Sequence, residues 1–287
     1  MSPVVIPDSL ATELAERRCV VVLGAGASAA ASNALGAHPP TWDAFLNGAL
    51  GLLTRKGDAD AAREQIAIRR YLDAAQIIVD GLPPADFSKY VRDCFERPRF
   101  EASKIHELVL ELDPKIVVTT NYDDLYEALC RQGAAVEGYN VCRYYEEHAV
   151  NDLRSDRRLI LKAHGCISNP SRIILTREQY FTARRDHPSF YSVLDALMLT
   201  NTLLFIGCSM DSDPDVQLLL ENSSIAAPSQ HPHYAIVEDL WHPAVERVLA
   251  KTYNMNFLKF DPGDYRQVQG ALEDLLGMVR ARRALPS

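Results

Sequence analysis

Residues 116–124 read Ile-Val-Val-Thr-Thr-Asn-Tyr-Asp-Asp, and this stretch decides the fold. Its first part is a short, mostly β-branched run, which is typical of a buried strand in a parallel sheet. The polar residues Thr120, Asn121 and Asp123 follow the run at once. In open α/β folds, ligands bind at the carboxyl edge of the sheet. The stretch therefore predicts a strand that ends in a ligand-binding site.

Further apolar runs predict more strands, and most of these runs are separated by helical stretches: residues 19–23, 159–162, 203–206, 234–237 and 256–260. Strands that alternate with helices predict a parallel sheet with helices on both faces. We therefore expect an α/β, doubly wound, Rossmann-like fold.

The chain is expected to form a single domain over residues 1–287. Apolar spacings of three and four, without a convincing strand, predict a helical insertion at about 38–112. An amphipathic stretch at about 264–284 predicts a closing C-terminal helix.

Composition narrows the class of protein. The chain has 287 residues, of which 47% are hydrophobic, and its net charge is −8. No apolar run approaches the roughly 20 residues of a membrane span, and no signal peptide is recognisable, so we expect a cytoplasmic protein without membrane contact. The acidic balance argues against direct nucleic-acid binding. The six cysteines include no Cys-x-x-Cys pair, so we expect free buried thiols and no metal site.

The segment Gly24-Ala25-Gly26-Ala27-Ser28 follows the first predicted strand and matches the start of a dinucleotide-binding fingerprint. Gly24 is expected to make a tight turn, and Gly26 to let the backbone approach a diphosphate at a helix N-terminus. A turn that only packs strand against helix explains the same glycines. A dehydrogenase needs a second strand about 20 residues later, ending in an acid for the ribose. Here that region is loop and helix, which disfavours hydride transfer.

Three other strand ends carry polar groups. Asn121 has an amide that can donate and accept hydrogen bonds at once, and so can orient a water or a carboxamide. Alternatively, Asn121 and Asp123 only cap the next helix. His164, followed by Gly165, is a candidate general base, although a lone histidine is often structural. Ser209 is expected to bind ribose or phosphate. Alternatively, the acids that follow it, Asp213 among them, only start the next helix, where they favour its dipole.

Taken together, these motifs resemble the sirtuin-like family in order and spacing over residues 17–262. In that family NAD lies over the sheet edge, the glycine turn holds its diphosphate, and the histidine is the catalytic base. The resemblance implies the catalytic residues Asn121, Asp123 and His164, and the NAD-binding residues Gly24, Ala25, Gly26, Ser28, Thr120, Gly207, Ser209 and Asp213.

Two departures from the family pattern indicate a subgroup. The four-cysteine zinc ribbon of protein-deacylating sirtuins is missing, so no zinc is expected, and residues 34–42 differ from the deacylase loop. The helical insertion and the Thr-Thr-Asn-Tyr-Asp motif resemble bacterial proteins that hydrolyse NAD in anti-phage defence. This resemblance implies release of nicotinamide and ADP-ribose by a homo-oligomer. It also implies control by a partner such as a hexameric DNA-translocating ATPase or a short argonaute.

Three alternatives stay open. One is a zinc-independent, NAD-dependent protein deacylase, for which the altered loop at 34–42 is unfavourable. Another is a non-catalytic subunit that senses NAD or ADP-ribose. Such a subunit would not need a general base such as His164. The last is an architectural subunit, which would not require polar residues at all four strand ends.

Overall fold

The computed structural model describes residues 4–132, 138–210 and 231–284. Within these residues, one sheet has the strand order β3-β4-β2-β1-β5-β6-β7, and every neighbouring pair is parallel. Its strands are β1 (Cys19–Leu23), β2 (Ile116–Thr119), β3 (Tyr139–Arg143), β4 (Arg158–Lys162), β5 (Thr202–Ile206), β6 (His233–Glu238) and β7 (Met255–Phe260). The predicted α/β fold with a parallel sheet is confirmed.

Six of these strands match the predicted runs to within about one residue at each end, whereas β3 was not predicted. The sequence of β3, Tyr-Asn-Val-Cys-Arg, lacks the continuous apolar run of a central parallel strand. The reason is its place at the edge of the sheet, where it pairs only with β4. Most of its residues are half-buried, so an apolar run is not required.

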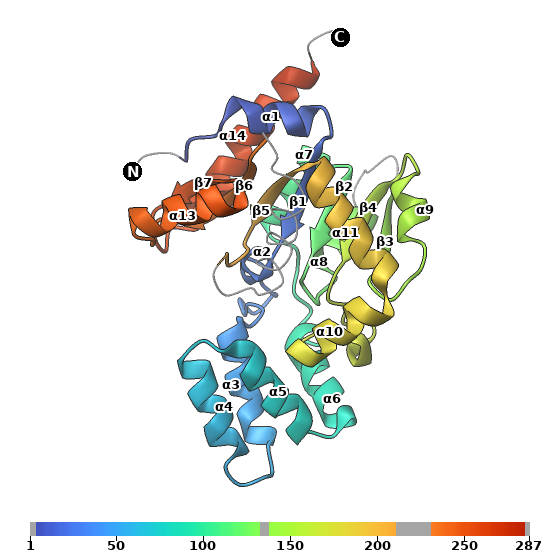
Figure 1. Ribbon diagram of the computed structural model, residues 1–287, viewed down its shortest axis with the longest axis vertical. Helices are drawn as coiled ribbons and strands as arrows, with labels where there is room; N and C mark the ends of the chain where they lie inside the picture. The colour runs from blue at the N-terminus through green and yellow to red at the C-terminus, as the bar shows by residue number, and fades with distance from the viewer. Residues whose placement is uncertain (1–3, 133–137, 211–230, 285–287) are drawn as a thin grey trace.

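Helices cover both faces of the sheet (Figure 1). Alternate residues of β1 divide between two cores, with Val21 and Leu23 in one and Val20 and Val22 in the other. The first core includes residues of α1 (Asp8–Ala15), α7 (Lys104–Leu112), α8 (Leu125–Gln132) and α14 (Arg266–Arg283). The second includes residues of α9 (Ala149–Leu153), α10 (Arg177–Asp186) and α11 (Pro188–Thr200).

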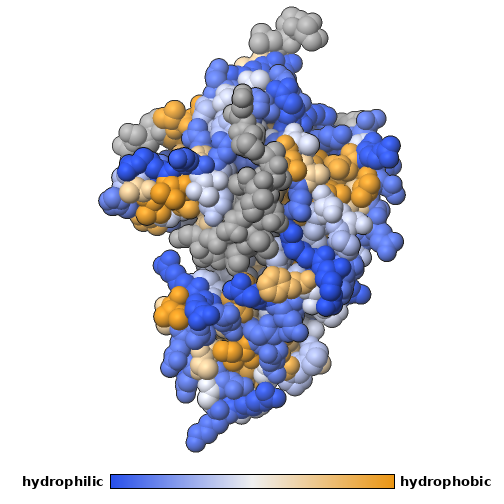
Figure 2. Space-filling model, in the orientation of Figure 1, coloured by the Kyte–Doolittle hydropathy of each residue, from blue (hydrophilic) through white to orange (hydrophobic). Residues whose placement is uncertain are grey.

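Helix α13 (Pro243–Tyr253) lies against β7, next to a ring contact of 4.9 Å between Trp241 and Phe257. None of its residues is buried, and Val245 and Val248 are exposed. Figure 2 shows hydrophobic side chains at the surface over this helix. No helix in the described part of the chain has the length and apolar composition of a membrane span.

A helical lobe, residues 42–95, extends from the sheet (Figure 1). It consists of α3 (Trp42–Ala49), η1 (Leu50–Leu52), α4 (Asp58–Ala67), α5 (Tyr71–Gly81) and α6 (Pro84–Phe95). The lobe has a hydrophobic core that is separate from the two cores of the sheet. Four residues that follow β4 also belong to this core (Cys166, Ile167, Ile173 and Leu175). Helix α7, by contrast, contributes to the first core of the sheet. Two further short helices in the described residues are α2 (Ala25–Ala29) and η2 (Pro170–Arg172).

We expect His233 to make the protein less stable in acid. Its Nδ1 accepts a hydrogen bond of 3.1 Å from the backbone N–H of Leu203, and burial lowers its pKa from 6.5 to about 4. Between these pH values the unfolded chain binds a proton that the folded chain does not. The free energy of unfolding therefore falls by about 1.4 kcal/mol for each unit by which the pH is lowered.

The variant His233→Asn keeps an acceptor near Nδ1 and does not titrate. Urea unfolding at pH 7.5 and pH 5 should show that the variant loses about 1–2 kcal/mol less stability than the wild type on acidification. An equal loss in both proteins would contradict this origin of the acid sensitivity.

Candidate functional site

The register of the sheet brings the four predicted motifs to one edge. Leu23 pairs with Thr119 on one side and with Ile206 on the other, and Thr119 pairs with Lys162. The residues that follow these positions therefore leave the sheet side by side at its carboxyl end. This is the edge at which ligands bind in open α/β folds.

The glycines of the turn after β1 pack against the end of β5. The N–H of Gly24 donates to the carbonyl of Ile206 (3.0 Å), and the N–H of Gly26 donates to that of Gly207 (2.8 Å). A Cβ on Gly26 would lie 2.9 Å from the Cα of Gly207, and a Cβ on Gly207 would collide with the nitrogen of Ala27. Packing thus accounts for all three glycines. Their contact with a diphosphate stays a prediction, and α2, with five residues, adds little dipole to it.

Asn121 is fixed through its amide nitrogen. Its Nδ2 donates to the carbonyl of Gly24 (2.9 Å) and to Oγ of Ser28 (2.8 Å). A carbonyl oxygen can only accept, so this contact assigns the amide nitrogen and leaves Oδ1 on the other side. No hydrogen bond from the described residues reaches Oδ1, and the side chain is half-buried. The arrangement presents an oriented acceptor at the sheet edge.

Asp123 lies behind Ser28 and is buried. The hydroxyl of Ser28 donates to its Oδ2 (2.7 Å), and the N–H of Leu125 donates to its Oδ1 (3.1 Å). Asp123 therefore does cap the start of α8, and the same carboxylate orients Ser28. Gly24, Ser28, Asn121 and Asp123 thus form one connected group of hydrogen bonds.

A buried cation lies beneath this group and was not predicted. Nζ of Lys162 donates to the carbonyl of Asp123 and forms an ion pair with Glu127. Burial is the largest influence and by itself would lower the pKa of Lys162, but the surrounding negative groups, Glu127 first and Asp123 among them, together outweigh it, so the pKa is raised and the lysine is charged. His106 is buried nearby, and burial lowers its pKa against the opposing charge of Asp123. A lysine inside an apolar strand run was the available sequence signal.

His164 follows β4 by two residues and is buried. Its carbonyl accepts a hydrogen bond of 3.0 Å from the N–H of Ile174. Gly165 has a φ of +81°, and a Cβ there would collide with the carbonyl of Arg172. The returning segment 172–174 therefore holds the His164–Gly165 backbone in place.

The other predicted binding residues differ in exposure. Ala25, Gly26 and Ser209 are exposed, and Thr120 is half-buried, with its N–H directed to the carbonyl of Leu23 (3.4 Å). Asp213 lies outside the described residues. The binding roles of all these residues stay predictions.

Comparisons with known proteins agree on one family. The family described as "SIR2-like domain" matches residues 115–258. The NAD(+) hydrolase ThsA of Enterococcus faecium is 30% identical over 142 residues, which are 49% of this chain and 29% of that protein. The ThsA of Acinetobacter baumannii is 28% identical over 138 residues, 47% and 28% of the two chains. Defense-associated sirtuin 2 of Bacillus subtilis is 26% identical over 154 residues, 52% of this chain and 14% of that protein.

The matches cover only part of each protein. The aligned stretches cover less than one third of the length of each relative named here. The family match begins at residue 115, so it contains Asn121, Asp123 and His164 but not the glycine turn. The motif with Gly207 and Ser209 also lies within the matched range, and the glycine turn joins the other motifs through the register of the sheet. The roles of all these residues stay predictions.

Replacement of Gly207 should be costly. Gly207→Ala adds a Cβ in a position that collides with the turn and has a φ of +68°, so we expect a loss of about 3 kcal/mol or more in the free energy of unfolding. Gly270→Ala is the control, because this α14 glycine has open space around it, and alanine there should stabilise by about 0.5–1 kcal/mol. Chemical denaturation measures both; a neutral Gly207→Ala would contradict the close packing.

The Lys162–Glu127 pair should show strong energetic coupling. Lys162→Met leaves Glu127 buried without its partner, and we expect a loss of about 3–5 kcal/mol. Adding Glu127→Leu to Lys162→Met should recover much of that loss, because neither charge is then buried alone. Unfolding of the two single variants and the double variant gives the coupling; strict additivity would contradict it.

Proposed function

Because the chain belongs to the SIR2-like domain family, we propose that it is an NAD hydrolase that cleaves the bond between nicotinamide and ribose. One NAD and one water give nicotinamide, ADP-ribose and a proton. The names of the curated relatives support this reaction. The observation in this chain that carries the proposal is the amide of Asn121, anchored by its nitrogen with its oxygen directed away.

Hydrolysis at this bond requires a water held beside C1 of the ribose and a group that takes its proton. Positive charge develops on the ribose as the bond breaks, as in glycoside hydrolysis. The Oδ1 of Asn121 suits a water or a ribose hydroxyl, since both can donate to it. His164, on the adjacent strand end, is proposed as the base that removes the proton directly or through a ribose hydroxyl.

The remaining site residues are proposed to bind and to position. Asp123 acts through Ser28, whose hydroxyl it holds in contact with Asn121. The exposed Ala25, Gly26 and Ser209 are proposed to contact the diphosphate or ribose of NAD. The proposed NAD contacts are completed by Gly24, Thr120, Gly207 and Asp213.

The biological setting is also a proposal. We propose a role in anti-phage defence by depletion of NAD in the cytoplasm, and the name of the relative called a defense-associated sirtuin supports the defence part of it. An uncontrolled NAD hydrolase would kill its host, so we propose control through homo-oligomerisation or through a partner of the ATPase or argonaute kind. We further propose one domain over the whole chain, with the helical insertion at about 38–112 as part of it, since the helical lobe shares its core with the segment after β4.

The test is product analysis with purified protein and NAD. Wild type should release nicotinamide and ADP-ribose in equal amounts, as chromatography would show. His164→Ala should lower the rate by about 10²- to 10⁴-fold, the usual loss when a general base is removed. Asn121→Ala should also lower the rate, because the water or ribose hydroxyl loses its acceptor. The matched control is Asp124→Asn, which changes an exposed residue of the same motif and should leave the rate unchanged.

Other outcomes separate the alternatives. NAD binding by calorimetry without product would favour a sensing subunit or a missing activator. Transfer of an acyl group from an acyl-lysine peptide to ADP-ribose would favour a deacylase. Full activity in His164→Ala would remove that residue as the base. Failure of wild type to bind NAD at all would overturn the proposed function.

A further inference from the structure

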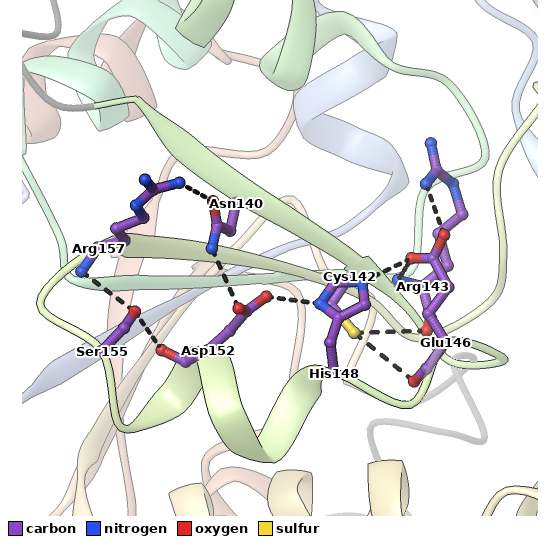
Figure 3. A network of polar contacts seen from close by, with 8 residues as sticks. All are labelled: Asn140, Cys142, Arg143, Glu146, His148, Asp152, Ser155 and Arg157. Atoms are coloured by element: carbon purple, nitrogen blue, oxygen red, sulfur yellow. Dashed lines mark hydrogen bonds and ion pairs between the residues drawn. The ribbon is translucent and has the colours of Figure 1, made fainter.

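A second polar cluster lies at the carboxyl end of the edge strand β3 and at the start of α9 (Figure 3). It contains the thiol of Cys142, the carboxylate of Glu146 and the imidazole of His148. One ligand atom from each lies within 4.8 Å of the other two. In Figure 3 the three side chains converge from the strand, the turn and the segment before α9.

The imidazole of His148 is oriented by a carboxylate. Its Nδ1 lies 2.6 Å from Oδ2 of Asp152, and Oδ1 of Asp152 accepts from Nδ2 of Asn140 (3.1 Å). A proton on Nδ1 therefore satisfies Asp152, which leaves the lone pair of Nε2 on the side of Glu146, 3.5 Å from its Oε2. A histidine held in this way by a carboxylate is a recurring feature of metal sites in proteins.

Glu146 is held just as firmly. The guanidinium of Arg143 lies 3.0 Å from its Oε1, and the backbone N–H of Arg143 donates to its Oε2 (2.7 Å). This oxygen is also the one near His148. Neighbouring residues therefore hold the side chains of Glu146 and His148 in place before any ion binds.

We propose that Cys142, Glu146 and His148 bind a divalent transition-metal ion of the zinc class, with a water as the fourth ligand. Thiolate, imidazole and carboxylate are the donors that zinc uses, at about 2.0–2.3 Å. Ligand atoms around a tetrahedral ion with bonds of this length lie about 3.3–3.8 Å apart, and the three atoms here already lie within 4.8 Å of one another. The exposed His148 and the half-buried Glu146 give an ion access from solvent, although Cys142 is buried.

The charges of the cluster suit such an ion. A Cys142 thiolate, Glu146 and Asp152 carry three negative charges, and Arg143 with a divalent cation carries three positive ones. Binding replaces the S–H hydrogen of Cys142, and that proton passes to solvent. No oxidation or reduction takes place.

A nucleophilic role for Cys142 fits the geometry less well, although Cys142, His148 and Asp152 are the residue types of a thiol catalytic triad. The side chain is fully buried, and its Sγ lies 3.6 Å and 3.8 Å from the carbonyls of Arg143 and Glu146. Burial raises the pKa of this thiol to about 12, so without a metal it is uncharged at neutral pH. Metal coordination removes that barrier, because a bound cation deprotonates the thiol that coordinates it.

The site differs from the zinc ribbon whose absence the sequence indicates. It uses one cysteine in a Cys-x-x-x-Glu-x-His spacing and lies on a strand that the sequence did not predict. It is also joined to the candidate NAD site, since Arg143 pairs in register with Lys162 and the N–H of Tyr144 donates to the carbonyl of Lys162 (3.1 Å). A bound ion would therefore fix the turn that lies beside the buried cation of that site.

The test uses the full chain, freed of metal with a chelator and then titrated with Co²⁺ as a spectroscopic probe and with Zn²⁺. We expect one ion per chain, a thiolate-to-cobalt charge-transfer band that Zn²⁺ abolishes, and a higher melting temperature with Zn²⁺. Cys142→Ser should abolish the band, and His148→Ala should do so or weaken binding. Asp152→Asn should lower affinity about 10- to 100-fold, since it only orients His148.

The controls are Cys94→Ser and His38→Ala, which remove a half-buried cysteine and a loop histidine elsewhere in the chain. Both should bind as wild type does. The proposal is overturned if wild type gives no thiolate band, or if Cys142→Ser binds as tightly as wild type. These readouts need no NAD, so they are independent of the proposed hydrolase activity.

Discussion

The arrangement of residues at the carboxyl edge of the sheet depends on the contacts of the Lys162 ammonium group. It reaches from β4 across to the carbonyl of Asp123 and to the carboxylate of Glu127 on α8. Strand β4 and the segment 123–127, which are well separated in the sequence, are thereby held at one point. Asp123 in turn orients Ser28, and Ser28 contacts Asn121. The buried charge is thus linked to the amide of Asn121 through Asp123 and Ser28, and the carbonyl of Gly24 holds the same amide from the other side.

The glycines around β1 and β5 constrain the same edge from the other side. The order of the strands reverses between β1 and β5, which is where an open sheet ordinarily leaves a crevice. Here the backbones of Gly26 and Gly207 are in close contact at that point. The proposed ligand must therefore lie over the strand ends, on exposed residues such as Ala25 and Ser209.

Much of this edge was predictable from sequence, because buried parallel strands have apolar runs and polar residues at their ends are conspicuous. The strand β2 and its Asn121 are the clearest case. Contacts between distant residues were not predictable. Nothing in the sequence near Lys162 indicates Glu127 as its partner, and nothing in the polar β3 indicates that Cys142 lies near His148. Edge strands and buried ion pairs are set by tertiary neighbours, which local pattern does not record.

The shared core of the helical lobe has a mechanical consequence. Cys166 and Ile167, just after His164, and Ile173 and Leu175, on the returning segment, pack among the side chains of the lobe. The lobe therefore packs directly against the short loop that carries His164. The close contact of Gly165 with Arg172 constrains the backbone of that loop. A protein that binds to α3, α4 or α5 and displaces the lobe would therefore also displace the loop that carries His164.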